Sequence, residues 1–196
     1  PEGIKRGARN GIRILYHCQF ADEEALDLIQ ARGNDVFVGP TVGVAWAGRE
    51  NAIKTHGSLE EALKKVGSFK SIDAYYKVFP EFRKRGFKLT IGGDYGFPFN
   101  PIGRNARDLE ILVKEYSFDA CEALTFATKN GADLMGMADE LGQIKVGYLA
   151  DILLVDGDPI ADIGILQDKD RLAMIMQDGK QYKPFQRRQA LPMAAE

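Results

Sequence analysis

The sequence predicts an α/β fold in which parallel strands alternate with helices, followed by a small β unit. Up to about residue 140, short runs of β-branched and aromatic residues alternate with segments whose apolar residues recur at helical spacing. From Gly142 onward, short apolar runs are separated by turns rich in Asp and Gly. Strands that alternate with helices form parallel βαβ units with right-handed crossovers, so we expect the first part to build a parallel sheet.

Glycines and capping residues mark the ends of the elements in this first part. Gly11, Gly33 and Gly86 each follow an amphipathic stretch, as residues that end a helix do. Asp22 is an acidic cap for the helix beside it, and Ser58 opens a capping-box pattern. The predicted elements are, in order, the end of a helix at 4–11, a strand at 13–17, a helix at 21–32, a strand at 35–38, a short helix from 58, a helix at 72–85, a strand at 87–91, and helices at 104–116, 119–129 and 131–135.

One stretch of this part, residues 41–71, is irregular in its pattern apart from the short helix from Ser58. His56 falls inside it, and we interpret this histidine as a solvated loop residue rather than as a substrate contact from a lid. Pro80 lies within the predicted helix at 72–85 and should kink or divide it, because proline has no N–H to donate.

The second part of the chain predicts short strands joined by tight turns. Strong turn signals stand at 156–159 and 178–180, where Asp and Gly are adjacent. The predicted strands are 142–147, 150–155 and 172–176, and residues 186–196 should form a frayed tail.

Composition limits the class of protein. The 196 residues are 45% hydrophobic with a formal charge of only -2, which fits a folded domain and excludes disorder over most of the length. The near-neutral balance argues against a nucleic-acid partner, and no apolar run approaches the roughly 18 residues of a membrane helix. The two cysteines are far apart, so a disulfide scaffold is not expected.

Functional residues in parallel α/β folds gather at the carboxyl ends of strands. Here the first predicted strand ends at His17 and Cys18, the second is followed by Thr41, and the third is followed by Asp94. A lone histidine is more often structural, and an aspartate after two glycines is more often a turn residue. Together, however, His17 and Asp94 would face one cleft, and imidazole nitrogen and carboxylate oxygen are metal ligands. For Cys18, a buried structural thiol is favoured over a ligand or nucleophile.

Four segments resemble the C-terminal part of the metal-dependent amidohydrolase superfamily, in its imidazolonepropionase- and prolidase-like branch. They are residues 14–24, 92–96, 122–136 and, most specifically, 141–159, which runs from Leu-Gly-Gln-Ile-Lys to Val-Asp-Gly-Asp-Pro. The resemblance implies the C-terminal portion of a (β/α)8 TIM-type barrel, with strands 6–8 and their helices, plus part of a small β-sandwich. It places the partial barrel at 1–140, part of the composite sandwich at 141–185 and a tail at 186–196.

The resemblance also implies an active site with one or two divalent metal ions, usually zinc. His17 corresponds to the metal ligand after strand six. Asp94 corresponds to the aspartate after strand eight, which binds metal and serves as general base or acid. No family role transfers to Thr41, and the substrate-binding residues stay unassigned.

The implied activity is hydrolysis of C–N bonds in small amides, cyclic amides or dipeptides by an activated metal-bound water. The family's paired histidines after strand one, its strand-four lysine or glutamate and its strand-five histidine have no counterpart here. We therefore expect a fragment of a longer protein, located in the cytoplasm. The alternative is a catalytically inert partial domain that needs its N-terminal half or self-association.

Overall fold

The computed structural model describes residues 1–185, so the predicted tail at 186–196 lies outside them. The first sheet holds three parallel strands in the order β1-β2-β3, namely Ile14–Tyr16, Phe37–Gly39 and Lys88–Leu89. Leu15 is in register with Val38, and Val38 with Leu89. The predicted parallel sheet is therefore confirmed, and its strands neighbour one another in chain order.

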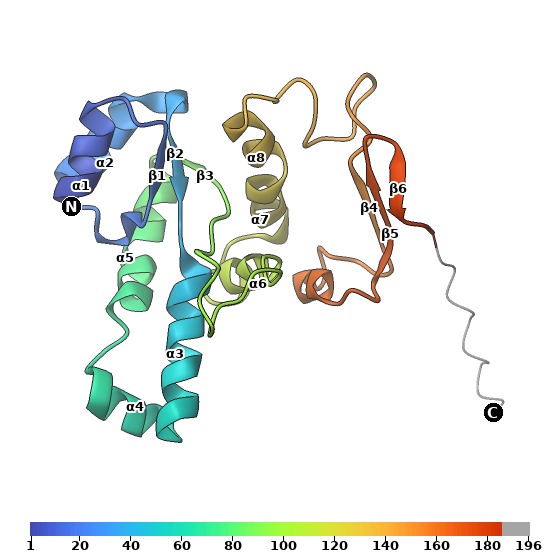
Figure 1. The fold of residues 1–196 in the computed structure, drawn as a ribbon. Coiled ribbons are helices and arrows are strands. Elements are labelled where there is room, and N and C mark those ends of the chain that lie inside the picture. The colour runs from blue at the N-terminus through green and yellow to red at the C-terminus, as the bar shows by residue number, and fades with distance from the viewer. Residues whose placement is uncertain (186–196) are drawn as a thin grey trace.

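Eight helices accompany the strands among the described residues (Figure 1). Three of them begin at a side chain that accepts a hydrogen bond from the first turn: Asp22, Ser58 and Asp119. The helices are α1 Glu2–Arg9, α2 Glu23–Ala31, α3 Val42–His56, α4 Leu59–Val66, α5 Lys70–Lys84, α6 Arg107–Lys114, α7 Ala120–Ala127 and α8 Lys129–Leu134.

Helix α3 corrects the interpretation of residues 41–71 as mainly irregular, and His56 is the last residue of this helix rather than a loop residue. The buried face of α3 is made by Val42, Gly43 and Ala47, which are too small to give a clear apolar stripe in the sequence. Pro80 also does not divide α5, which runs unbroken past it. The large buried side chains of α5 hold it against the sheet on both sides of the proline.

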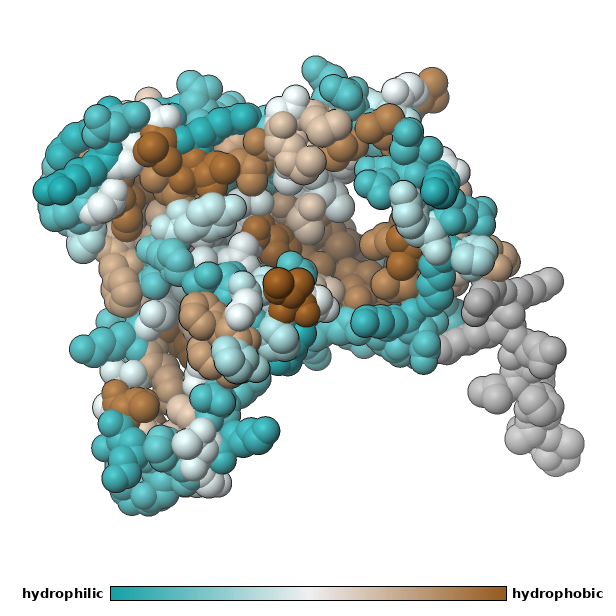
Figure 2. All heavy atoms as spheres, in the orientation of Figure 1, coloured by the Kyte–Doolittle hydropathy of each residue, from teal (hydrophilic) through white to brown (hydrophobic). Residues whose placement is uncertain are grey.

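Aromatic rings from α5 and from the segment after α6 fill the main core. Tyr75 stacks on Phe79 with 5.0 Å between ring centroids, and Phe79 meets the edge of Phe118 at 5.0 Å. This cluster packs against Val38 and Leu89 of the sheet, all of them buried. On the face shown in Figure 2, hydrophobic atoms also reach the surface beside both sheets, between hydrophilic helical surfaces.

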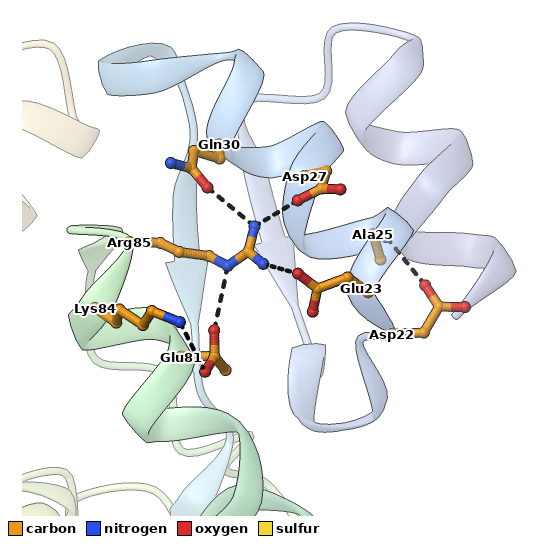
Figure 3. A network of polar contacts seen from close by, with 8 residues as sticks. All are labelled: Asp22, Glu23, Ala25, Asp27, Gln30, Glu81, Lys84 and Arg85. Carbon is orange, nitrogen blue, oxygen red and sulfur yellow. Dashed lines mark hydrogen bonds and ion pairs between the residues drawn. The ribbon is translucent and has the colours of Figure 1, made fainter.

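Arg85, just after α5, ties that helix to α2 (Figure 3). Its Nη1 donates to Asp27 Oδ1 at 2.6 Å and to Gln30 Oε1 at 2.9 Å, and the guanidinium also pairs with Glu23 and Glu81. The hydrogen bond to Asp27 raises the pKa of the guanidinium above its ordinary value. These contacts fix two of the helices that cover the sheet.

The second sheet is antiparallel in the order β4-β5-β6, with strands Ile152–Val155, Leu172–Gln177 and Lys180–Lys183 (Figure 1). The strand predicted at 142–147 is absent: Gly142 and Gly147 both have a left-handed backbone, and Ile144 and Val146 between them are exposed. Four residues between two such turns find no neighbouring strand to pair with in the described chain.

The fold is thus α/β, with three parallel strands in the first sheet and no closed barrel among residues 1–185. The numbering of these strands as barrel strands 6–8 and the boundary near residue 140 stay predictions. No helix in this part of the chain is long and apolar enough to cross a bilayer.

Candidate functional site

The segments that follow β1, β2 and β3 meet at the carboxyl edge of the sheet. A cavity of about 520 Å³ opens there, and its lining includes His17, Thr41 and Asp94. Nε2 of His17 lies 3.6 Å from Oδ2 of Asp94, and the two side chains are 54% and 41% exposed. The structure therefore brings together the two side chains predicted as site residues, with solvent access to both.

The backbone at both residues lies in the left-handed region, with φ of 58° at His17 and 53° at Asp94. This region is energetically unfavourable for residues other than glycine, so the surrounding structure must hold them there. At Asp94 the restraint is Asn100, whose buried amide Nδ2 donates to the carbonyl of Gly93 at 3.0 Å and to that of Asp94 at 2.9 Å.

Gly93 is required for close packing. A Cβ added there would lie 2.3 Å from the ring of Tyr95, which packs directly on the backbone before Asp94. Asn100 and Tyr95 therefore hold the Gly93–Asp94 segment from two directions.

His17 is oriented through its other ring nitrogen. Thr41 Oγ1 lies 2.9 Å from His17 Nδ1 and 3.1 Å from the hydroxyl of Tyr75. The Tyr75 hydroxyl also accepts a hydrogen bond from the Thr41 N–H at 2.8 Å. Burial raises the pKa of Tyr75 to about 12, so this phenol stays neutral and the chain of three polar groups is fixed.

A second polar pair lies behind the cavity. The hydroxyl of Tyr95 donates to Oδ1 of Asp108 at 2.6 Å, and Asp108 is 1% exposed. Burial raises the pKa of the Asp108 carboxyl to about 6, against opposing effects of Tyr95 and Arg107. Oδ2 of Asp108 has no hydrogen-bond partner within residues 1–185.

Sequence reasoning missed Thr41, Asn100 and Asp108 as site residues. Thr41 stands at a strand end, which is a usable signal, but its partner Tyr75 lies 34 positions away. For Asn100 and Asp108 the sequence carries no comparable signal, because a turn asparagine and a helical aspartate are ordinary at such positions.

The donors at this edge fit a divalent metal in type, although they are too few to hold one by themselves. A nitrogen of His17 and an oxygen of Asp94 face each other, and zinc binds both kinds of atom. Across residues 1–185 no group of three or more His, Cys, Asp or Glu side chains is placed to hold a metal. Cys18 is no candidate, since it is fully buried and burial raises the pKa of its thiol to about 12.

Comparisons with known proteins point to one family. The model described as "Amidohydrolase family" matches residues 78–182. Ochratoxinase from Aspergillus niger is 26% identical over 182 residues, which are 92% of this chain and 36% of that protein. Imidazolonepropionase from Rubrobacter xylanophilus is 32% identical over 85 residues, which are 41% of this chain and 20% of that protein.

Solved structures agree with this result. The crystal structure of a Xaa-Pro dipeptidase with bound methionine in the active site superimposes with a TM-score of 0.75 at 29% identity. The match covers 93% of this chain and 43% of that one. The chain thus spans less than half of these relatives.

Proposed function

Since the chain belongs to the amidohydrolase family, whose model matches just over half of it, we propose that it takes part in hydrolysing C–N bonds of small amides or dipeptides. The observation that carries the proposal is the approach of His17 Nε2 to Asp94 Oδ2 in the lining of a cavity at the carboxyl edge of the sheet. Metal-assisted hydrolysis uses a nitrogen ligand for the metal and a carboxylate that accepts a proton, and these two strand ends offer one of each.

A divalent metal, for which we propose zinc, would be held by His17 and Asp94 and would supply Lewis acidity toward the amide carbonyl. For His17 to offer the lone pair of Nε2, the proton must sit on Nδ1, and the Nδ1–H would donate to Thr41 Oγ1. The Thr41 hydroxyl would then donate to the Tyr75 oxygen. The neighbouring hydroxyls can thus accommodate the tautomer that a ligand needs.

Asp94 would act as general base and then general acid. Its carboxylate accepts a proton from the attacking water and delivers it to the leaving nitrogen. Because Asn100 holds the left-handed backbone of Asp94, the segment that carries the carboxylate is positioned before substrate arrives.

The alternative is that the chain is inert until other residues complete the site. It is favoured by the small ligand set, because catalytic zinc sites use three protein ligands and this edge offers two. The missing ligands would come from an N-terminal half or from a second copy of the chain.

The test is hydrolysis of a panel of Xaa-Pro dipeptides and N-acyl amino acids by the zinc-loaded protein. We expect Asp94→Asn to lower turnover by about 10²–10⁴-fold, because asparagine keeps the shape and cannot take the proton. Asp139→Asn, at an exposed residue away from the cavity, is the matched control and should leave the rate unchanged. His17→Ala should weaken zinc binding instead, so that excess zinc restores part of its activity.

Two outcomes would count against the proposal. Turnover by Asp94→Asn above about a tenth of the parent rate would remove Asp94 as the base. Absence of hydrolysis in the chain alone, followed by its appearance when an N-terminal half is supplied, would establish the alternative.

A further inference from the structure

A second cavity, of about 680 Å³, adjoins the first at His17 and Thr41, which line both. One of its walls is helix α3. The other runs from Val66, at the end of α4, to Ile72 in the first turn of α5. A molecule seated at His17 therefore has room to extend between α3 and α5.

Apart from His17, every charged side chain that lines this cavity is a cation. Arg49 from α3 and Lys70 from α5 line it, and no Asp or Glu does. Elsewhere on the described chain, cations such as Lys5 and Arg85 are each paired with three carboxylates. Arg49 and Lys70 have no carboxylate of residues 1–185 within ion-pair distance.

Arg49 is held in place without a counter-ion. Its guanidinium lies over the ring of Trp46, 5.2 Å from the centroid. The ring is in turn fixed by a hydrogen bond of 3.1 Å from its Nε1 to the hydroxyl of Tyr116. A cation held by an aromatic face keeps its hydrogen-bond donors available for an anion.

The rest of the lining is mainly apolar. Val44, Ala45 and Ala52 contribute from α3, and Val66 and Phe69 from the opposite wall. Ser71 adds a hydroxyl that already accepts from the amide of Gln19 at 3.4 Å, so its own proton is available to a ligand. Apolar walls with two unpaired cations match a ligand that carries both a carboxylate and an apolar group.

We propose that this second cavity binds the carboxylate and the apolar side chain of an N-acyl amino acid or dipeptide whose amide lies near His17. Arg49 and Lys70 contact the carboxylate, and the α3 wall contacts the side chain. The inference deepens the proposed hydrolase function, on which it rests for treating the ligand as a substrate. The binding itself requires neither metal nor turnover.

The test is calorimetric binding of two probes that differ in charge alone, N-acetyl-L-leucine and N-acetyl-L-leucinamide, to the purified chain at low salt. We expect the acid to bind about tenfold more tightly or better, since a charge-assisted hydrogen bond contributes at least that much. The difference should shrink as salt is added, because these cations are reached by solvent.

The variant Arg49→Gln with Lys70→Gln should abolish the preference for the acid. Its matched control is Lys54→Gln with Lys77→Gln, which removes the same charge from the same two helices at residues that line other parts of the surface. The control should keep the preference. Arg49→Lys should keep part of the preference, because lysine preserves the positive charge but makes a smaller contact with Trp46 than the guanidinium does.

Equal affinity for the two probes in the parent chain would overturn the inference, as would equal losses in the two double variants. The outcome is separable from the proposed hydrolysis. Preferential binding of the acid without turnover would leave this inference standing and count against the hydrolase, whereas turnover without preference would do the reverse.

Discussion

Thr41 Oγ1 lies 2.9 Å from Nδ1 of His17, and this contact joins the ends of β1 and β2 at the site. The hydroxyl is itself buried and lies 3.1 Å from the hydroxyl of Tyr75 in the core. The exposed imidazole of His17 is therefore oriented by two buried hydroxyl groups, those of Thr41 and Tyr75. A partner of this kind fixes the orientation of a ligating ring.

We expect Thr41→Val to lower the zinc affinity of the protein by about 10–100-fold, as loss of such partners of a ligating histidine does. Valine has nearly the shape of threonine, so the fold should persist. Competition with a zinc chelator measures the affinity. Thr55→Val, at an exposed residue of α3, is the control and should have no effect. Unchanged affinity in Thr41→Val would mean that the contact with Nδ1 does not serve a metal ligand.

Gly93→Ala should reduce turnover even though it adds only a methyl group. The new Cβ would lie 2.3 Å from the Tyr95 ring, whose hydroxyl is held by Asp108, so either this ring or the backbone that carries Asp94 must shift. A displacement of about 1 Å at a catalytic group lowers rates by about 100-fold. The control is Gly3→Ala in α1, where a Cβ meets nothing within 4 Å and alanine is the better helix former. Full activity in Gly93→Ala would show that this packing does not position Asp94.

The juxtaposition of His17 and Asp94 was accessible from sequence because it depends on topology. Parallel strands end at one edge of a sheet, so the residues that follow β1 and β3 must lie close together whatever their side chains are. Helix α3 could not be predicted from the sequence, because Gly43 and Ala47 on its buried face do not form a recognisable apolar stripe. Its inner surface is made of small residues since the backbone of Gly93 lies 3.1 Å from where a Cβ of Gly43 would be.

The side chains that hold the site in place could not be predicted from the sequence for a different reason. Thr41 is held by Tyr75, and Asp94 is held by Asn100, which itself depends on the turn it closes. Such contacts are fixed by packing between distant segments, and single residues of these types carry no local pattern. The strand predicted at 142–147 shows the converse, since an apolar alternation without a neighbouring strand does not form a sheet.

We expect the chain to self-associate in solution. β4 and β6 are edge strands of a three-stranded sheet, and Leu153 and Leu154 on β4 are 56% and 43% exposed. Unpaired edges with exposed apolar side chains invite pairing with another chain. Light scattering at increasing concentration checks this, and Leu153→Lys should raise the monomer fraction. Met135→Lys, at an exposed residue outside the sheet, should not. A monodisperse 21.7 kDa species with a cooperative melt would contradict the prediction.

Asp108 gives the folded protein a specific pH dependence. Burial raises the pKa of its carboxyl from 3.8 to about 6, so between these values the folded state binds a proton that the unfolded state has released. The free energy of unfolding must therefore fall as pH rises through this window. A shift of about two units lowers the free energy of unfolding by about 3 kcal/mol at most, and this loss is complete once the pH is above the folded pKa.

Asp108→Asn isolates this contribution, because the amide cannot ionise and its oxygen can still accept from the Tyr95 hydroxyl. Arg107 and Tyr95 are the other titratable groups that act on this carboxyl, and both remain in the variant. Urea unfolding of the two proteins between pH 4 and pH 7 measures the difference. We expect the variant to gain stability over the parent as pH rises, with the gain levelling off above about pH 7. A constant difference across this range would mean that Asp108 is ionised in the folded state throughout, and the Tyr95 hydroxyl would then donate to a charged rather than a neutral partner.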